Sequence, residues 1–200
     1  MWLNGTPMGS PRDQLLRLVL DPSVLTHTDE PVQLSSGELS RDFIDAKLAV
    51  DDPEDLLLAG EAMVAAARDA GASFEAVGGM ALGSVPFTFA VAAAAPCRWF
   101  IVRKEPKGRG TDRWIEGTRI EPGMSVMLVD DVITIGGSIR DAHERVVAEG
   151  ATVVFATTLV DRGDRAAEYF AGVGVPYAPM LTYRDLDDVA DDSDVETYAS

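Results

Sequence analysis

Residues 126–138, VMLVDDVITIGGS, carry the strongest structural and chemical signal in the chain. Four apolar residues at 126–129 predict a buried strand, and Asp130 and Asp131 follow where this strand should leave its sheet. Such carboxylates accept charge-assisted hydrogen bonds from the vicinal hydroxyls of a ribose. The glycine-containing turn at 134–138 offers backbone N–H groups, and the N-terminus of the helix that should follow adds positive charge, which together favour a phosphate. The segment therefore predicts a site for a phosphorylated ribose.

The same segment also has an interpretation without a ligand, as an acidic strand end followed by a capped helix. Ser138 and Asp141 have the spacing of a capping box, which predicts that the helix begins at Ser138. Core packing alone gives no reason for two adjacent carboxylates at the end of a buried strand. We therefore favour the ligand site.

Strands and helices alternate over most of the chain. This alternation predicts right-handed crossovers and an α/β fold with an open, mostly parallel sheet flanked by helices. Such sheets bind ligands beyond the carboxyl ends of their strands, so the loops that begin at Gly78, Lys104, Asp130 and Asp161 should converge. The expected elements are helices over 11–20, 55–70, 86–95, 138–149 and 165–171, strands over 75–78, 98–103, 126–129, 152–159 and 175–181, a hairpin with strands near Val32 and Phe43, and a short ribbon near Trp114.

Length and composition fit one domain of 200 residues, with a small hood mainly from residues 1–50 and an acidic tail at 185–200. The chain has 33 acidic and 17 basic residues, and its net charge of -16 opposes general affinity for nucleic acid. No apolar run is long enough to predict a membrane span, and residues 1–10 do not resemble a signal peptide. A single cysteine, Cys97, excludes an internal disulfide, so we expect a cytoplasmic protein.

A basic cluster stands out against this acidic background. Residues 103–110, RKEPKGRG, place four cations and two glycines on a loop that starts at the end of a predicted strand. A hinged basic loop can close over pyrophosphate, neutralise the charge that grows as this group leaves, and exclude water. The alternative is a solvated surface loop. Because a ribose site is predicted beside it, we interpret this basic loop as pyrophosphate-binding.

Residues 126–138 resemble the motif with which type I phosphoribosyltransferases bind 5-phosphoribosyl 1-pyrophosphate (PRPP). The resemblance implies the fold of that family, an open parallel sheet with a small hood. It also implies a Mg²⁺ ion that is carried by PRPP, lies near Asp130 and Asp131, and needs no direct protein ligand. Ile135 departs from the family pattern, which has a small residue there; its bulk either crowds the phosphate loop or points into the neighbouring core.

The resemblance narrows to the orotate phosphoribosyltransferases over residues 34–186. Arg103, Lys104 and Lys107 match the basic loop of that family, whereas Arg109 stands where many members have histidine. Three further stretches resemble the family's base-covering hairpin, its pyrophosphate loop and its base-binding strand end, namely SSGELSRDFID at 35–45, GGMALGSVP at 78–86 and LVDRGD at 159–164.

The resemblance implies that orotate and PRPP are converted to orotidine 5'-monophosphate and pyrophosphate in pyrimidine (UMP) biosynthesis. It also implies a homodimer in which the basic loop reaches the neighbouring subunit's site. The implied site residues are, for catalysis, Lys107, Arg103, Asp130 and Asp131; for PRPP, Arg103, Lys104, Lys107, Arg109, Asp130, Asp131, Val132, Ile133, Thr134, Ile135, Gly136, Gly137 and Ser138; and for orotate, Phe43, Thr134 and Arg162.

Two alternative functions stay open on the sequence. Base selectivity depends on a few hood residues that the motifs do not specify, so a phosphoribosyltransferase for another nucleobase is the first. A non-catalytic PRPP-binding or nucleotide-binding regulator is the second, motivated by Ile135 and Arg109. Arg162 also has a structural interpretation, as the partner of Asp161 or Asp164 in a salt bridge.

Overall fold

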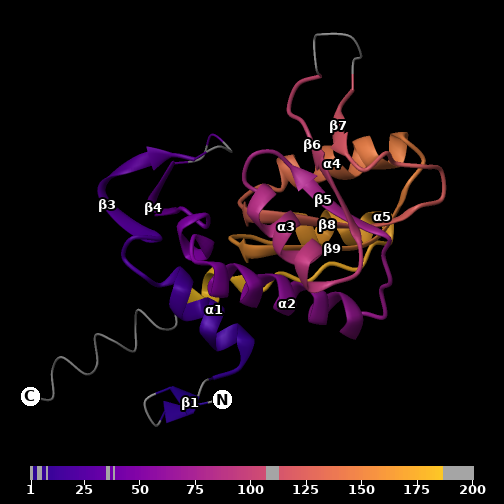
Figure 1. Cartoon of the computed structure of the whole chain (residues 1–200). Helices are drawn as coiled ribbons and strands as arrows, with labels where there is room; N and C mark the ends of the chain where they lie inside the picture. The colour runs from indigo at the N-terminus through magenta and orange to yellow at the C-terminus, as the bar shows by residue number, and fades with distance from the viewer. Residues whose placement is uncertain are drawn as a thin grey trace, which may run out of the picture.

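A sheet of six strands forms the centre of the molecule (Figure 1). The computed structural model describes residues 2–3, 6–7, 9–34, 37, 39–106 and 113–186. The strands of the sheet are β5 (Ala76–Met80), β6 (Arg98–Val102), β7 (Ile115–Gly117), β8 (Ser125–Ile133), β9 (Thr152–Asp161) and β10 (Leu181–Thr182). Their spatial order is β10-β9-β8-β5-β6-β7, and all neighbours are parallel except β7, which is antiparallel to β6. The predicted open, mostly parallel sheet and the predicted ribbon near Trp114 are therefore confirmed.

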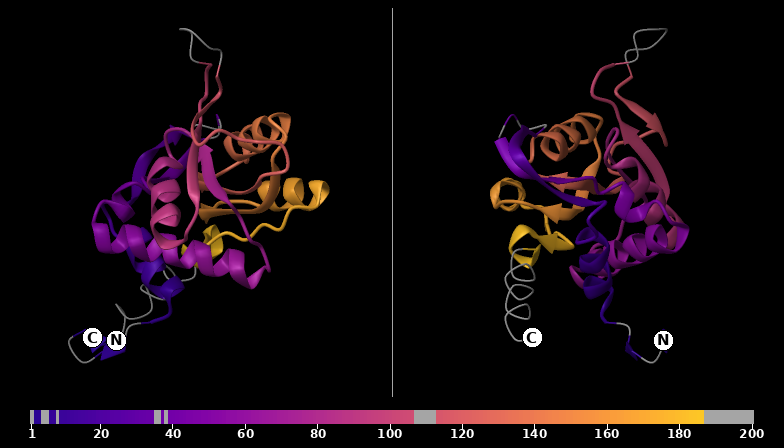
Figure 2. Two further views of the ribbon diagram at one scale, coloured as in Figure 1. Left: turned by 45° about the vertical axis from the view of Figure 1, so that its right-hand side comes forward. Right: turned by 90° about the vertical axis from the view of Figure 1, so that its left-hand side faces the viewer.

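Helices cover both faces of the sheet. One face carries α2 (Pro53–Asp69) and α3 (Val85–Ala94), with α1 (Pro11–Val19) packed beside α2, and the other carries α4 (Gly137–Ala148) and α5 (Arg165–Val173). The right panel of Figure 2 views the sheet from its side and shows these two helical layers on opposite sides. All five predicted helices form. Among the described residues, no helix has both the length and the apolar character to cross a membrane.

β8 joins the two halves of the core through its pleat. Met127 and Val129 belong to the hydrophobic cluster that α1, α2 and α3 cover, whereas Val126 and Leu128 belong to the cluster beneath α4 and α5. Successive strand residues point to opposite faces, so a strand covered on both faces requires an unbroken apolar run. All four side chains are fully buried, and each stabilises the fold by about 1.5–3 kcal/mol.

The hood contains the predicted hairpin, in which β3 (Leu25–Gln33) pairs antiparallel with β4 (Leu39–Ile44). Figure 1 shows this hairpin as an arm to one side of the sheet. Val24 and Ile44 belong to the same hydrophobic cluster as residues of α2 and β9. The hairpin is therefore anchored to the core of the sheet.

Two predicted strands differ from the structure by more than two residues at one end. β8 continues to Ile133 instead of ending at Val129, because β9 pairs with it along that whole stretch. The strand predicted over 175–181 shrinks to the two residues of β10, since Pro176 and Pro179 have no backbone N–H to donate. Three short elements were not predicted, namely β1 (Trp2–Leu3), its antiparallel partner β2 (Thr6–Pro7), and the 3-10 helix η1 (Leu48–Val50).

Candidate active site

The order of the strands in the sheet reverses between β5 and β8. The chain runs from β5 to β6 on one side and then crosses to β8 on the other side of β5. β8 pairs with β5 only from Val126 to Leu128, although it pairs with β9 as far as Ile133. Within the described residues, the last part of β8 thus has no sheet partner on its β5 side. Ligands of open α/β sheets bind at such a reversal of strand order.

Asp130 and Asp131, the carboxyl pair, lie on this last part of β8. Asp130 is buried, and Asp131 is partly exposed. The Asp131 backbone N–H donates to Asp130 Oδ1 over 3.1 Å, and Thr158 Oγ1 of β9 donates to the Asp131 carbonyl over 2.8 Å. The prediction that both residues follow the end of the strand is therefore wrong. Because the ladder with β9 continues, they sit on rigid backbone.

Burial raises the pKa of Asp130 well above its ordinary value, and the charge of Asp131 raises it further. The hydrogen bond from the Asp131 N–H and the positive charge of Lys104 act in the opposite direction. An ionised Asp130 is therefore costly in the protein alone. Hydroxyl donors or a cation brought by a ligand would offset this cost, so the carboxyl pair suits a ligand that carries both.

The loop after β5 lies directly against the carboxyl pair. A Cβ added at Gly83 would lie 2.2 Å from Asp131 Oδ2, so any other residue here would force the Asp131 carboxylate out of this position. Ser84 Oγ is buried and donates to the Met80 carbonyl over 2.8 Å, which ties the loop back to β5. The glycine-rich stretch at 78–86, which was expected at this edge of the sheet, therefore packs against the Asp131 side chain.

The turn after β8 surrounds a small pocket of about 80 Å³, lined by Asp130 and residues 132–138. Gly136 has a left-handed backbone conformation, with φ at 73°, and is the N-cap of α4. The predicted capping box between Ser138 and Asp141 is therefore wrong, because the helix begins one residue before Ser138. Gly136 has no side chain with which to cap the helix, so the first N–H groups of α4 stay available to an anion, which the positive end of the helix dipole favours.

Ile135 lines this pocket and is 36% exposed. It also lines an adjoining pocket of about 420 Å³ together with Arg140, Arg165 and Tyr169. The interpretation in which Ile135 points into the hydrophobic core is therefore wrong. The side chain instead borders the turn, where its bulk contacts the space expected for a phosphate.

Arg162 follows β9 directly and reaches the hood. Its backbone N–H donates to the Ile133 carbonyl over 2.8 Å, which joins it to the end of β8. Its Nη1 donates to the Asp42 backbone carbonyl over 3.0 Å, and its Nη2 donates to Ser40 Oγ over 2.8 Å. Arg162 thus connects the sheet edge with β4, and its guanidinium lies between them.

A pocket of about 400 Å³ lies between Arg162 and the hairpin. Phe43 is 46% exposed and is not among the residues that line this pocket. A contact between Phe43 and a base stays a prediction. The lining residues are Leu34, Leu39, Ser40, Thr134, Arg162 and Tyr183.

The basic loop lies in the connection between β6 and β7, whose described ends rise above the sheet in Figure 1. Arg103 begins this connection and pairs with Glu116 of β7 at 3.6 Å. Lys104 is exposed, and its positive charge lowers the pKa of the buried member of the carboxyl pair. Lys107 and Arg109 lie outside the described residues. The charge at the start of the basic loop thus acts on the carboxyl pair.

Asp161 has a partner that sequence reasoning did not identify. It is buried, accepts a hydrogen bond from Tyr177 Oη over 2.7 Å, and accepts another from the Gly163 N–H over 3.1 Å. Burial raises the pKa of Asp161, although both hydrogen bonds lower it. Among the described residues, no ion pair joins Arg162 to Asp161 or Asp164, so that structural interpretation of Arg162 is wrong.

Ser40 and Tyr183 were missed as residues of the Arg162 pocket. The Arg162 guanidinium lies over the Tyr183 ring, 4.8 Å from its centroid. The position of Ser40 in the resembling hairpin stretch was a usable signal, because alternate residues of a strand share a face. No sequence pattern marks Tyr183, which meets Arg162 only through the tertiary fold.

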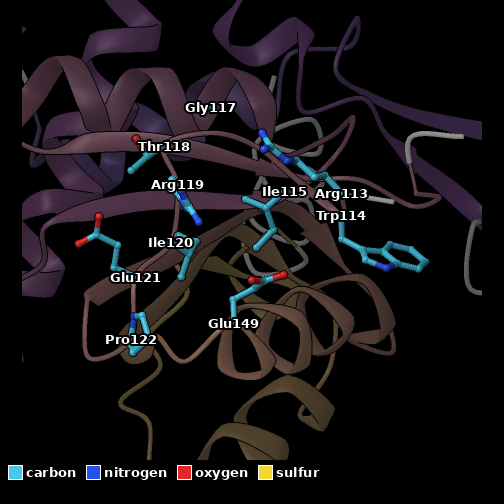
Figure 3. Close-up of a pocket in the computed structure, with 10 residues that line it drawn as sticks. All are labelled: Arg113, Trp114, Ile115, Gly117, Thr118, Arg119, Ile120, Glu121, Pro122 and Glu149. Carbon is cyan, nitrogen blue, oxygen red and sulfur yellow. The ribbon is translucent and has the colours of Figure 1, made fainter. Parts of the chain in front are cut away.

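A larger hollow of about 570 Å³ lies between residues 113–122 and Glu149, near the end of α4 (Figure 3). Arg113 and Arg119 line it, and in Figure 3 the Trp114 ring points away from it. Among the predicted site residues that the structure describes, none lines this hollow. We therefore place the candidate site at the carboxyl edge of the sheet.

The carboxyl pair fits a metal ion that comes with a ligand. In the part of the chain that the structure describes, no three His, Cys, Asp or Glu side chains form a cluster that could hold a metal. Mg²⁺ prefers oxygen donors, keeps several waters, and binds through one or two carboxylates together with phosphates. Two adjacent carboxylates, one of them accessible, match this requirement better than they match a site built by protein alone.

Comparisons with known proteins agree with this arrangement. Residues 50–171 match the family model described as phosphoribosyl transferase domain. An orotate phosphoribosyltransferase of Aquifex aeolicus is 36% identical over 181 residues, covering 88% of this chain and 97% of that protein. The crystal structure of Mycobacterium tuberculosis orotate phosphoribosyltransferase in complex with PRPP superimposes with a TM-score of 0.72 at 30% identity, covering 89% of this chain and 99% of that one. The chain therefore belongs to the phosphoribosyl transferase domain family and, within it, to the orotate phosphoribosyltransferases.

Proposed function

We propose that this orotate phosphoribosyltransferase transfers the phosphoribosyl group of PRPP to N1 of orotate, which yields orotidine 5'-monophosphate and pyrophosphate for UMP synthesis. One observation carries the proposal: Thr134 lines both the small pocket at the turn after β8 and the pocket beside Arg162. A ribose phosphate and a base can therefore be held side by side. The PRPP in the crystal structure of the M. tuberculosis relative supports PRPP as the ligand.

For the ribose, we assign the carboxyl pair as acceptors for the vicinal hydroxyls. The 5-phosphate then lies at the N-terminus of α4, where roughly half a positive charge resides. Ile135 narrows this position but leaves the backbone N–H groups of the turn accessible. The residues that contact the phosphate are those of the turn and its approach, Val132, Ile133, Thr134, Ile135, Gly136, Gly137 and Ser138.

For the pyrophosphate, we assign the cations of the basic loop, Arg103, Lys104, Lys107 and Arg109. In the proposed homodimer, this loop serves the neighbouring subunit's site. Asp130 and Asp131 would hold the hydration shell of a Mg²⁺ carried by PRPP. When bound, that ion neutralises charge on the departing pyrophosphate.

For the base, we assign Arg162 to the orotate carboxylate, with Thr134 and Phe43 beside the ring. The bond between orotate N1 and ribose C1 forms as the bond from C1 to the pyrophosphate oxygen breaks. The electron pair leaves with pyrophosphate, and the proton released from orotate N1 passes to the departing pyrophosphate or to water. No protein nucleophile takes part. The protein therefore accelerates the reaction by holding both reactants in line and by stabilising the charges of an oxocarbenium-like transition state.

The direct experiment follows the absorbance of orotate in the presence of the protein, PRPP and Mg²⁺. We expect depletion that requires all three. Other nucleobases, added one at a time, are tested for PRPP-dependent release of pyrophosphate. Turnover of another base but not of orotate would support the alternative phosphoribosyltransferase. Binding of PRPP without turnover of any base would support the regulator.

The role of the basic loop is tested with Lys107→Ala, which should slow turnover without changing the melting temperature. Mixing this variant with Asp130→Asn tests the exchange of loops between subunits. If the loop serves the neighbouring site, mixed dimers contain one intact site and recover activity that neither variant has alone. Mixed dimers without recovered activity would contradict the exchange.

The single-domain organisation and the cytoplasmic location also stay proposals. The packing of Val24 and Ile44 into the core of the sheet supports a hood that belongs to the same domain. Cys97 is free and partly buried, and a chain with one unpaired cysteine suits a reducing compartment.

A further inference from the structure

Asp42 lies beside Arg162, but its carboxylate does not pair with it. Arg162 Nη1 is 3.0 Å from the backbone carbonyl of Asp42, and the charge of Arg162 already helps to lower the pKa of the Asp42 carboxyl group. Within the described residues, however, no ion pair joins the two side chains, and Arg162 Nη2 donates to Ser40 Oγ instead. The guanidinium therefore makes its described hydrogen bonds to neutral acceptors and not to this nearby carboxylate.

Two other residues occupy the Asp42 carboxylate. The Tyr183 hydroxyl donates a hydrogen bond to Oδ2, and His27 Nδ1 lies 2.7 Å from Oδ1. Burial raises the pKa of Asp42, but the hydrogen bonds from Tyr183 and His27, with the charges of His27 and Arg162, bring it below its ordinary value. Asp42 is therefore an anion at neutral pH, held by partners other than Arg162.

Tyr183 contacts both members of this potential ion pair. Its ring lies under the Arg162 guanidinium, and its hydroxyl holds the Asp42 carboxylate. A guanidinium has five N–H donors. The hydrogen bonds to the Asp42 carbonyl and to Ser40 Oγ use two of them, on the hood side, and the remaining donors are left for a ligand in the pocket that Arg162 and Tyr183 line.

We infer that Tyr183 is a positioning residue that keeps Asp42 from pairing with Arg162, so that the guanidinium stays open to the carboxylate of an anionic base. The inference rests on the proposed function. Arginine binds carboxylates through two parallel hydrogen bonds. Without the tyrosine hydroxyl, the Asp42 carboxylate keeps only its contact with His27, and its Oδ2 competes for those donors. Tyr183 thus determines selectivity for an acidic base without touching the reacting atoms.

The test is a double-mutant cycle on Tyr183 and Asp42. Tyr183→Phe keeps the ring but removes the hydroxyl, and it should raise the KM for orotate about tenfold, with kcat and the KM for PRPP within about twofold of the wild type. Asp42→Asn alone should change little. In the double variant the competing charge is absent, so the KM for orotate should return close to the wild-type value. A merely structural role for the hydroxyl would not produce this rescue.

Tyr169→Phe is the matched control, since it removes a tyrosine hydroxyl that lies 2.9 Å from His143 Nδ1, between α4 and α5. It should leave both KM values unchanged, and melting temperatures report whether each variant folds. An unchanged KM for orotate in Tyr183→Phe, or no rescue in the double variant, would overturn the inference. Calorimetric titration with orotate keeps the two proposals distinct: a wild type that neither binds nor converts orotate contradicts both, whereas wild-type turnover with an unaffected Tyr183→Phe contradicts only this one.

Discussion

The guanidinium of Arg145 lies over the ring of Trp114, with its central carbon 3.8 Å from the ring centroid. The same guanidinium donates a hydrogen bond to the Arg103 carbonyl, and the Arg103 N–H donates to the Trp114 carbonyl over 2.8 Å. Arg145 therefore contacts both ends of the connection that contains the basic loop. Arg145 belongs to α4, which begins at the glycine-containing turn after β8. The same helix therefore contacts the ends of this connection.

Replacing Arg145 should loosen the basic loop at both ends. Arg145→Ala removes a cation–π contact and a hydrogen bond, and we expect kcat to fall about tenfold, which is roughly 1.4 kcal/mol of barrier. Arg145→Lys keeps the charge but loses the planar stacking, so its kcat should lie between those of the wild type and Arg145→Ala. Arg68→Ala is the control, since Arg68 also lies in the last turn of a helix and is exposed. Steady-state kinetics that do not distinguish Arg145→Ala from this control would contradict the role.

Gly83→Ala should damage the site without unfolding the protein. The added Cβ has to move Asp131, and a displacement near 1 Å costs on the order of 100-fold in kcat/KM for PRPP. Gly172→Ala is the contrasting change, because no atom lies within 4 Å of its Cβ position in α5. It should stabilise the protein by roughly 0.5–1 kcal/mol with unchanged kinetics. A kcat/KM for PRPP close to the wild-type value in Gly83→Ala would show that the loop can move away from Asp131.

Asp130→Asn should increase stability and abolish most activity. The pKa of Asp130 is raised in the folded state, so its contribution to stability is present at low pH and is lost as the pH rises through the folded pKa. At about pH 7 the variant should melt higher, by roughly 2–4 °C for each kcal/mol gained. Toward about pH 4 the difference in melting temperature between the variant and the wild type should shrink. Thermal melts at both pH values measure this difference. A lower melting temperature at neutral pH would contradict the cost assigned to this carboxylate.

His143 should make the protein less stable in mild acid. Burial between α4 and α5 lowers its pKa, only partly opposed by the charge of Glu144. A lowered pKa means that the stability is present above the unfolded pKa of about 6.5 and is lost as the pH falls through the folded value. Melting temperatures between about pH 7.5 and 5 should therefore fall more steeply for the wild type than for His143→Gln. Parallel curves would exclude His143 as the cause.

Local patterns were sufficient for the sheet, the helices and the turn after β8. The run VMLV predicted a doubly covered strand correctly, because its four side chains alternate between the two halves of the core. The end of that strand was placed too early, since charged residues rarely continue a buried strand. The pairing of Val132 with Val160 on β9, which no local pattern contains, extends it.

The base side of the site was predictable in part. Arg162 was identified from its own short stretch, and the structure places its guanidinium at a pocket. Its partners Ser40, Asp42 and Tyr183 come from segments that are far away in the sequence. Phe43 was chosen from the resembling hairpin, but it is not among the residues that line that pocket.

By itself, the sequence determined that this chain has an α/β fold with the carboxyl pair, the glycine-containing turn after it and a cluster of basic residues at 103–110, because each depends on residues that are neighbours in the chain. Only the tertiary structure decided that Gly83 lies against Asp131, that Arg145 supports the basic loop, and that Tyr183 holds Asp42 beside Arg162. Hydrogen bonds and stacking act over a few ångströms in space. Residues that no local sequence pattern marks, such as Tyr183, join the site only when the fold brings them within that range.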